Sequence, residues 1–324
     1  LVMSILVTGA AGFIGFHLIK KILNKNKKVF GIDNINNYYD TNLKKDRINN
    51  LKKNKNFYFY KVDLSNYKKL NDIIKKNKIN IIIHLAAQAG VRYSIKNPRT
   101  YFKSNLEGFF NILEISRDNK IKHLIYASTS SVYGDSKKFP LNENDRTDEP
   151  LSFYAATKKS NEVMAHSYSY IYKLPCTGVR FFTVYGPFGR PDMALFKFTK
   201  NIINNHPIEL YNSGNHLRDF TYVDDIVDGI YSLINKQSKK TIPYQIFNIG
   251  NGTPKKLLDY LKYIEKNLKK ISKTKKLPLQ VGDIVKTHSN INKLKKYTGY
   301  KPKTNIKIGI QKFIEWYKDY YRIN

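Results

Sequence analysis

The sequence predicts an α/β protein with a doubly wound parallel sheet and a smaller C-terminal α/β lobe. Three observations carry this prediction. Short β-branched runs alternate with helical patterns from Ile5 to Phe182, a glycine-rich turn joins the first strand to the first helix, and pieces punctuated by Pro and Gly follow Tyr185. Strands that alternate with helices form parallel sheets with right-handed crossovers. A chain of 324 residues is long enough to bury a substantial core.

The elements of the sheet can be followed in order along the chain. Residues 4–25 predict a strand, a turn and a helix, because the apolar residues after the turn recur at helical spacing, at Ile14, Leu18, Ile19, Ile22 and Leu23. A second strand is expected in the run that ends at Asp33. Further strands, each separated by a helical pattern, are predicted at residues 57–64, 79–87, 121–128 and 176–182.

The second lobe is expected after Tyr185, where the alternating pattern breaks up. Residues 222–234 predict a helix, and residues 244–249 predict a strand that returns to the first domain. The chain is therefore expected to cross between two domains more than once. Residues 3–184 with 223–248 would form the sheet domain, and residues 185–222 with 249–324 would form the lobe.

Cysteine content and hydropathy indicate the cellular compartment of the protein. Cys176 is the only cysteine, so no internal disulfide and no zinc site built on cysteines is expected. No apolar run approaches the roughly 20 residues of a membrane span, and the N-terminal residues lack the pattern of a secretion signal. These features predict a cytoplasmic protein with no membrane partner and no metal ion.

The formal net charge of +32 raises the alternative of a nucleic-acid-binding protein. The lysines, however, are spread over the whole length and are mixed with Asn, Ile and Tyr. This distribution is typical of a solvated surface, so no nucleic-acid partner is expected. A basic surface would also help to collect an anionic small substrate.

The glycine-rich turn predicts a dinucleotide site. Gly9, Gly12 and Gly15 stand at G-x-x-G-x-x-G spacing between a strand and a helix, where backbone can approach a pyrophosphate at the helix N-terminus. Asp33 ends the next strand, where a carboxylate can accept hydrogen bonds from both ribose hydroxyls. This carboxylate would repel a 2′-phosphate, so NAD is favoured over NADP. A tight turn without a ligand is the alternative interpretation.

A second pattern indicates catalysis. Tyr154 and Lys158 stand four residues apart and share one face of a predicted helix. A tyrosine with a pKa of about 10 is a poor base at neutral pH, but a neighbouring ammonium and a positive nicotinamide ring both favour the phenolate. An incidental pair in a chain rich in Tyr and Lys is the alternative, and the dinucleotide turn argues against it.

Together, several motifs resemble the extended short-chain dehydrogenase/reductase family. They are the glycine turn, "DL" at 63–64, "HLAA" ending at Ala87, "SNLEG" around Asn105 and "YAATK" at 154–158. The resemblance implies a Rossmann domain that binds NAD, a C-terminal lobe that binds a nucleotide-sugar, and a homodimer built from two helices per subunit, near residues 97–117 and 155–172. It also implies a catalytic role for Thr129, whose hydroxyl would bond the reacting sugar oxygen.

The NAD site implied by the motifs comprises Gly9, Ala11, Gly12, Phe13, Ile14, Gly15, Asp33, Asn34, Asp63, Leu64, Leu85, Ala86, Ala87, Asn105, Tyr154 and Lys158.

The stretch "STSSVYG", residues 128–134, narrows the reaction. Relatives that dehydrate a sugar carry Asp and Glu directly after the catalytic Thr, because eliminating water needs a separate acid and base. This chain has Ser130 and Ser131 there, and relatives that decarboxylate a UDP-uronate keep a Glu where Ser131 stands. An epimerisation, which moves one hydride and one proton and returns them, is therefore favoured.

Three further stretches, "GRPDMA", "DNINNYYD" and "QAGVRYS", resemble the UDP-glucuronate 4-epimerases. The expected function is NAD-dependent epimerisation of UDP-glucuronate to UDP-galacturonate, with Tyr154 as the base. Thr183 and Arg190 would hold the sugar carboxylate. The chain departs from the family pattern at Val281, where Pro is common, and at Asn290, where Asp is usual. The complete substrate site expected is Ser130, Ser131, Thr183, Arg190, Tyr211, Arg218, Asp283 and Arg92.

Two alternative functions remain compatible with the sequence. One is a 4-epimerase of a neutral or N-acetylated UDP-hexose, in which Arg190 would pack the lobe or bind phosphate. The other is a non-catalytic protein that binds nucleotides or nucleic acid through its basic surface, against which the intact catalytic residues argue.

Overall fold

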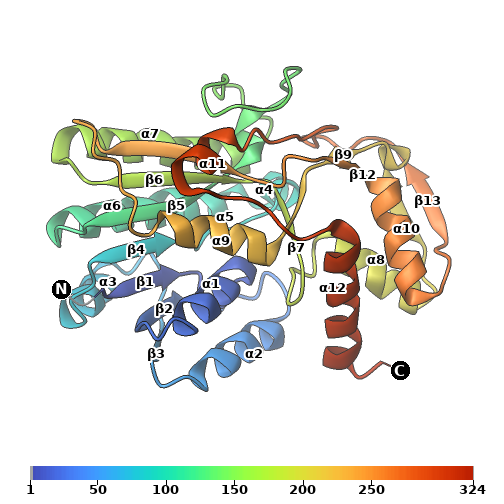
Figure 1. The fold of residues 1–324 in the computed structure, drawn as a ribbon, viewed down its shortest axis with the longest axis horizontal. Coiled ribbons are helices and arrows are strands. Elements are labelled where there is room, and N and C mark those ends of the chain that lie inside the picture. Colours follow the sequence, from blue (N-terminus) through green and yellow to red (C-terminus); the bar gives the residue numbers. More distant parts are fainter. Residues whose placement is uncertain (1–2, 324) are drawn as a thin grey trace.

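The computed structural model describes residues 3–323 and contains a seven-stranded sheet in which every pairing is parallel (Figure 1). The spatial order is β11-β6-β5-β4-β1-β2-β3. This confirms the predicted fold class, including the return of residues 244–249 to the sheet. The strands are β1 Ile5–Thr8, β2 Val29–Asp33, β3 Phe57–Lys61, β4 Ile81–His84, β5 His123–Thr129, β6 Cys176–Phe181 and β11 Tyr244–Ile249.

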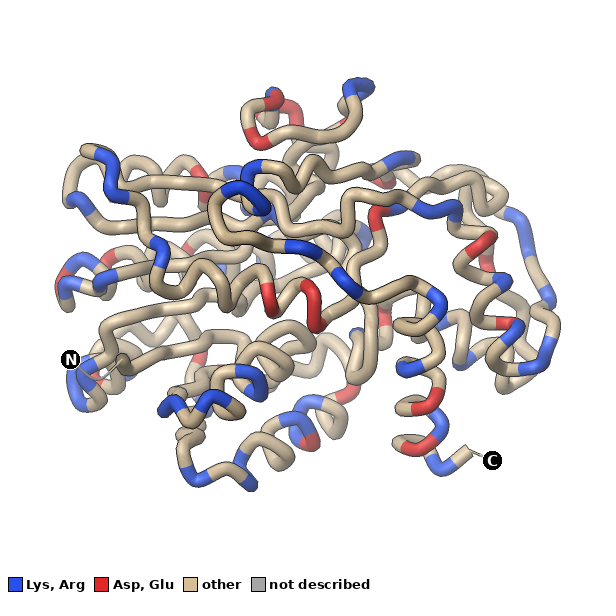
Figure 2. The backbone as a smooth tube through the Cα atoms, viewed as in Figure 1, with Lys and Arg blue, Asp and Glu red and all other residues tan. Residues whose placement is uncertain are grey.

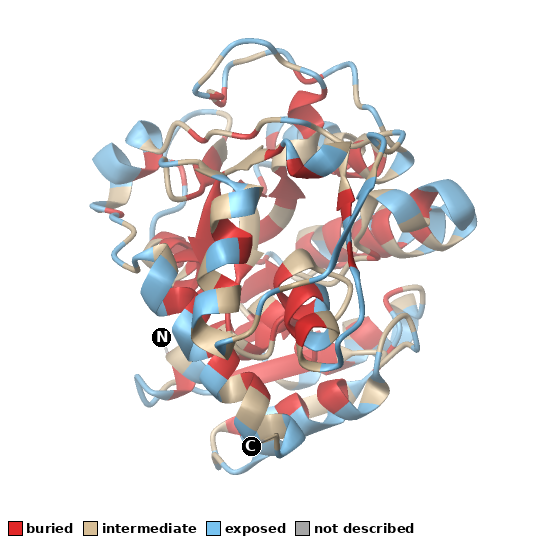
Figure 3. Ribbon diagram, turned by 90° about the vertical axis from the view of Figure 1, so that its right-hand side faces the viewer, coloured by how far each residue is buried: buried red, intermediate tan, exposed pale blue. Residues whose placement is uncertain are grey.

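Both faces of the sheet are buried, which explains why its strands are almost continuously apolar. Successive residues of a strand point to opposite faces, so Ile5 and Val7 join one core cluster and Leu6 joins the other. Figure 3 shows these buried strands inside a shell of exposed helix surface. The first core includes α1 Phe13–Leu23, α2 Thr41–Lys52 and α9 Val223–Leu233; the second includes α3 Tyr67–Lys76, α6 Gly108–Asp118 and α7 Phe153–Tyr172.

The strand order reverses at β1, which pairs with β2 on one side and β4 on the other. In open α/β sheets ligands bind in the crevice outside the carboxyl ends of the strands at such a switch point. The fold therefore places a binding site where β1, β4 and β5 end.

The second lobe lies beside this edge, on the right in Figure 1. Its helix α10 packs against α8 and α12, and three two-stranded sheets support it, β13–β8, β12–β9 and β10–β7. Its main elements are β7 Thr183–Tyr185, α8 Ala194–Ile203, β8 Ile208–Tyr211, β9 Leu217–Arg218, β10 Phe220–Tyr222, β12 Lys255–Lys256, α10 Leu257–Leu268, β13 Thr274–Leu277 and α12 Ile306–Tyr321. The short helix α11, Asn292–Thr298, instead packs on α9 and β11 of the sheet domain.

The helix expected near residues 97–117 is present and unbroken. It runs from α5, Pro98–Tyr101, through a π-helical turn, Phe102–Glu107, into α6, and it follows the short helix α4, Val91–Lys96. Within the π-helical turn, the Asn105 side chain bonds the backbone of Gln88 and the hydroxyl of Thr157. Single π-helical turns within helices occur frequently at functional sites, and this one lies behind the carboxyl end of β4.

Lys and Arg are distributed over both lobes (Figure 2). None of the helices within residues 3–323 is both long and apolar enough to cross a membrane. The same residues contain no cluster of three or more His, Cys, Asp or Glu that could hold a metal ion.

Candidate active site

A cleft of about 1040 Å³ lies between the carboxyl ends of the strands and the second lobe. Small-molecule pockets usually measure about 300–1,000 Å³, so this cleft has room for more than one ligand. Its wall includes the glycine turn, the ends of β2, β4 and β5, the start of α7, and residues of the lobe from Thr183 to Asp283.

The glycine turn packs so closely on neighbouring backbone that side chains would not fit at two of its positions. Gly9 has a φ of +73°, and a Cβ there would lie 2.8 Å from the Ala86 backbone nitrogen. A Cβ at Gly15 would overlap the Gly9 carbonyl oxygen. Helix α1 begins at Phe13, and its N-cap Gly12 has no side chain to bond the first-turn amides. These amides and the helix dipole favour an anion, so the turn fits the pyrophosphate of NAD.

Asp33 lies where the cofactor ribose would bind. Its carboxylate accepts hydrogen bonds from the backbone N–H groups of Ala11, at 3.1 Å, and Ile35, at 2.7 Å. Burial raises the pKa of Asp33, and these two hydrogen bonds together with nearby Lys44 act in the opposite direction. The carboxylate thus faces the cleft while it fixes the loop, as expected for a group that accepts from ribose hydroxyls.

We predict that Asp33→Ala weakens NAD affinity at least about tenfold, since a hydrogen bond to a charged group contributes roughly 1.5–3 kcal/mol. UDP affinity should stay close to that of the wild type, because Asp33 lies at the cofactor end. Titration calorimetry with NAD and with UDP measures both. Asp72→Ala is a matched control, since Asp72 is exposed on α3. An equal loss of affinity for NAD and for UDP would indicate a folding defect instead.

Tyr154 and Lys158 lie in the first two turns of α7, which Ser152 caps by accepting from the Ala155 N–H at 3.2 Å. The Lys158 ammonium donates to the Ala127 carbonyl of β5 at 2.9 Å. Burial lowers the pKa of Lys158 to about 8. This contact fixes the catalytic helix two residues before Thr129, the last residue of β5.

The surroundings of Tyr154 determine whether it can act as a base. Burial raises the pKa of Tyr154, whereas the positive charge of Arg190 and a hydrogen bond with Thr129 lower it. The ring of Tyr101 packs edge-on against Tyr154, with centroids 6.1 Å apart. Further positive charge in the cleft would favour the phenolate, and the nicotinamide ring of bound NAD carries such a charge.

The turn that follows β5 carries hydroxyls and no carboxylate. Ser130 and Ser131 lie in a 3-10 turn, Ser130–Tyr133. The Thr129 hydroxyl donates to the Ser131 hydroxyl and accepts from its N–H, both at 3.2 Å. All three residues line the cleft. The site therefore offers hydroxyl groups to a sugar oxygen without a second acid–base pair at this position.

Arg190 faces the same part of the cleft. Its Nε donates to Asp192 at 3.0 Å, and its Nη2 donates to the other oxygen of that carboxylate. The Tyr38 hydroxyl also donates to Asp192, at 3.1 Å. Asp192 thus engages the Nε and Nη2 edge of the guanidinium, and Tyr38 lies close enough to interact with both Arg190 and Asp192. Arg190 also lines the cleft, so its positive charge is placed to attract a ligand anion.

Two arginines mark the far end of the cleft. Arg218 and Arg92 both pair with Asp283, at 3.1 and 3.6 Å. The guanidinium of Arg92 also lies over the ring of Tyr211, 4.5 Å from its centroid. The two arginines thus share the Asp283 carboxylate, and arginines are frequent partners of phosphate groups, so a diphosphate fits this region.

Almost every site residue expected from the sequence lines this cleft; only Ala11 and Asn105 do not. The Ala11 side chain is buried in the core and its N–H is used by Asp33. Asn105 acts from behind the wall by holding Gln88. The cleft also contains residues that were not named as site residues. Tyr38, Gln88, Tyr93 and Asp192 lie within the three stretches that resemble the UDP-glucuronate 4-epimerases, whereas Lys44 and His216 lie outside them.

Because the glycine turn, the tyrosine–lysine pair and the anion-binding lobe share one cleft, the site can exchange a proton and a hydride with a nucleotide-linked alcohol. This is the chemistry of the extended short-chain dehydrogenases/reductases. The sequence matches the NAD dependent epimerase/dehydratase family over residues 5–250, and the chain belongs to that family.

Individual relatives are similar over nearly the whole chain. Protein CapI of Staphylococcus aureus is 50% identical, covering 99% of this chain and 100% of its own. A probable UDP-glucuronate 4-epimerase of Rhizobium meliloti is 43% identical, covering 99% and 98%. The crystal structure of UDP-glucuronic acid 4-epimerase from Bacillus cereus, in complex with UDP-glucuronic acid and NAD, superposes with a TM-score of 0.92 at 34% identity, covering 98% and 100%.

Proposed function

We propose that this enzyme is a UDP-glucuronate 4-epimerase, which interconverts UDP-glucuronate and UDP-galacturonate with NAD as cofactor. The observation that carries the proposal is the placement of the Arg190 guanidinium in the same cleft as Tyr154 and Thr129. The family and the relatives named above support the same activity.

In the proposed cycle Tyr154 removes the proton of the sugar 4-hydroxyl while Thr129 hydrogen-bonds that oxygen. NAD, when bound, supplies the acceptor and later the donor of the C4 hydride. Lys158, anchored on Ala127, favours the phenolate form of Tyr154. The sugar becomes a 4-keto compound, turns about its bonds to the diphosphate and presents its other face. Tyr154 then returns the proton to the 4-oxygen.

The carboxylate of the sugar needs restraint during this cycle. The 4-keto compound is a β-keto acid, and it loses CO2 when its carboxylate is perpendicular to the carbonyl plane. We assign to Arg190 and Thr183, which both line the cleft, the role of holding the carboxylate in an unreactive orientation.

The principal alternative is a 4-epimerase of a neutral or N-acetylated UDP-hexose. With a neutral sugar in the cleft, Asp192 would be the only anionic partner of the partly buried Arg190, whereas a uronate supplies a second carboxylate. Incubation with UDP-glucuronate, UDP-glucose and UDP-N-acetylglucosamine, followed by separation of products, tests the proposal. We expect rapid conversion of UDP-glucuronate alone, and conversion of a neutral sugar alone would overturn the assignment.

The assignment of domains and residues is part of the proposal. We assign NAD to the domain formed by residues 3–184 and 223–248, and the UDP-sugar to residues 185–222 and 249–324, of which α11 packs on the first domain. Within the cleft, Tyr211, Arg218, Asp283 and Arg92 would hold the uridine diphosphate. Ser130 and Ser131 would contact the sugar.

We also propose a homodimer formed by α6, α7 and the π-helical turn. These neighbouring elements expose large apolar side chains, a feature typical of interaction surfaces. Their exposed members are Phe102, Phe110, Phe153, Val163, Tyr170, Ile171 and Tyr172.

A charged residue on this surface should separate the subunits. Val163 on α7 is 58% exposed, and we expect Val163→Glu to shift the mass measured by light scattering from dimer to monomer. Ile308→Glu is the matched control, because Ile308 is 51% exposed on α12 in the other lobe. A wild-type protein that is monomeric at micromolar concentration would contradict the proposal.

A further inference from the structure

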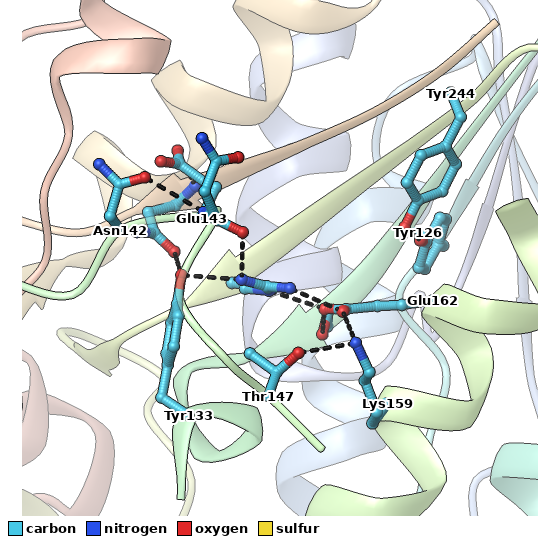
Figure 4. Close-up of polar contacts among 12 residues, drawn as sticks. Tyr126, Tyr133, Asn142, Glu143, Thr147, Lys159, Glu162 and Tyr244 are labelled. Carbon is cyan, nitrogen blue, oxygen red and sulfur yellow. Dashed lines mark hydrogen bonds and ion pairs between the residues drawn. The ribbon is translucent and has the colours of Figure 1, made fainter. Parts of the chain in front are cut away.

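A buried polar network lies directly behind the catalytic helix (Figure 4). At its centre, Glu162 of α7 and Arg180 of β6 form a two-pronged ion pair, with Nε to Oε1 and Nη2 to Oε2 both at 2.8 Å. Both side chains are only 4% exposed. Neither lines the cleft, so the pair touches neither of the proposed ligands.

The Glu162 carboxylate connects the helix to the strand that carries Thr129. It accepts a hydrogen bond of 2.6 Å from the hydroxyl of Ser128, the residue directly before Thr129. On α7, Glu162 follows Lys158 by four residues and Tyr154 by eight, which places all three on one side of the helix. One carboxylate thus joins the two elements that supply the proposed base and its hydroxyl partner.

Arg180 connects the same pair to the turn after β5. Its Nη1 donates to the Tyr133 hydroxyl at 2.9 Å and to the Glu143 carbonyl at 3.2 Å. Tyr133 ends the 3-10 turn that carries the two serines, and its own hydroxyl donates to Asn248 of β11 at 2.7 Å. The network therefore also fixes the hydroxyl-bearing turn against the sheet.

We propose that the Glu162–Arg180 pair is a positioning device that sets the separation of Tyr154 and Thr129 for the proposed epimerisation. Stability alone is a poor explanation for it, because a buried ion pair can often be replaced by apolar residues at no net cost. The pair and its hydrogen-bond partners connect α7, β5 and the 3-10 turn. The proposed chemistry depends on how these three elements are placed relative to one another. The inference rests on the proposed function, since it concerns the same reaction.

The test separates positioning from stability with two variants. Glu162→Gln removes the charge and leaves Arg180 unpaired, so we expect a lower melting temperature and a kcat reduced at least about tenfold. The double variant Glu162→Leu/Arg180→Met replaces the pair by apolar side chains of similar size, so its melting temperature should recover. Its kcat should stay low with a near-normal KM, because small misplacements of reacting groups can cost about a hundredfold.

The pH profile provides a readout that a purely structural role would not move. A weaker Thr129 contact raises the pKa of Tyr154, so the acid limb of kcat/KM should shift to higher pH in both variants. Tyr101, Lys158 and Arg190, the other titratable groups facing Tyr154, are unchanged in them. Lys137→Met is the control, because Lys137 is exposed and pairs with Asp135 outside the network, and this variant should match the wild type.

Recovery of kcat together with the melting temperature in the double variant would overturn the inference. A wild type that does not convert UDP-glucuronate would instead overturn the proposed function. The same variants would then be compared on whichever UDP-sugar does turn over, so that the positioning role is decided independently.

Discussion

Tyr154→Phe should reduce turnover of UDP-glucuronate at least about 100-fold, the usual scale for loss of a positioned acid–base group. The substitution removes only the phenolic oxygen, so the packing of the ring against Tyr101 remains. Lys158 keeps its contact with the Ala127 carbonyl. We therefore expect an unchanged circular-dichroism spectrum and an NAD affinity near that of the wild type.

Tyr170→Phe is the matched control for this variant, because Tyr170 lies on the same helix with 59% of its surface exposed. It should keep the wild-type rate under conditions that preserve the oligomer. A Tyr154→Phe variant with a near-normal rate would remove Tyr154 from the mechanism.

The pH dependence of wild-type activity should follow the protonation state of Tyr154. Because burial raises the pKa of Tyr154 above its ordinary value, the phenolate fraction of this base grows as pH rises. The value of kcat/KM should therefore rise as pH increases toward this pKa. Removing Arg190, whose charge lowers that pKa, should move the acid limb to still higher pH.

Arg190→Ala should weaken UDP-glucuronate binding about tenfold to a hundredfold and leave UDP binding nearly unchanged. A hydrogen bond to a charged group contributes roughly 1.5–3 kcal/mol, and UDP lacks the carboxylate. Calorimetry with both ligands measures the difference. Arg146→Ala is the control, since Arg146 is also paired with carboxylates but is exposed and outside the cleft.

The products formed by the Arg190 variants provide a second test of whether Arg190 holds the sugar carboxylate. A uronate free to rotate in its 4-keto form should lose some CO2 and leave a UDP-linked pentose. Arg190→Lys should rescue binding only in part, because a point charge cannot both satisfy Asp192 and present a planar edge to the ligand. Equal weakening of UDP and UDP-glucuronate would instead assign Arg190 to the diphosphate.

The fold could be predicted because its signals are local. Alternating β-branched and helical stretches specify a parallel sheet, and the glycine spacing specifies the turn at which β1 and α1 meet. The return of β11 to the sheet could also be predicted, since residues 244–249 form an apolar strand after a helix. The π-helical turn before α6 could not be predicted, because Asn105 within it contacts Gln88 and Thr157, 17 and 52 residues away.

Within the site, local motifs identified the cofactor turn and the base, whereas the residues that orient them were missed. Asp192 lies in a proline-containing loop with no periodic pattern, and only the folded chain brings Tyr38 to it, 154 residues away. Glu162 and Arg180 look like ordinary charged residues of a helix and a strand. Their pairing appears only once α7 packs on β6.

The most direct test of the central claim follows UDP-glucuronate labelled with deuterium at C4. We predict that the product is UDP-galacturonate with the deuterium still at C4, because the hydride leaves and returns to the same carbon. Nuclear magnetic resonance and mass spectrometry of the separated product measure both the configuration and the label. Loss of the label to solvent, or a product unchanged in configuration at C4, would contradict the account.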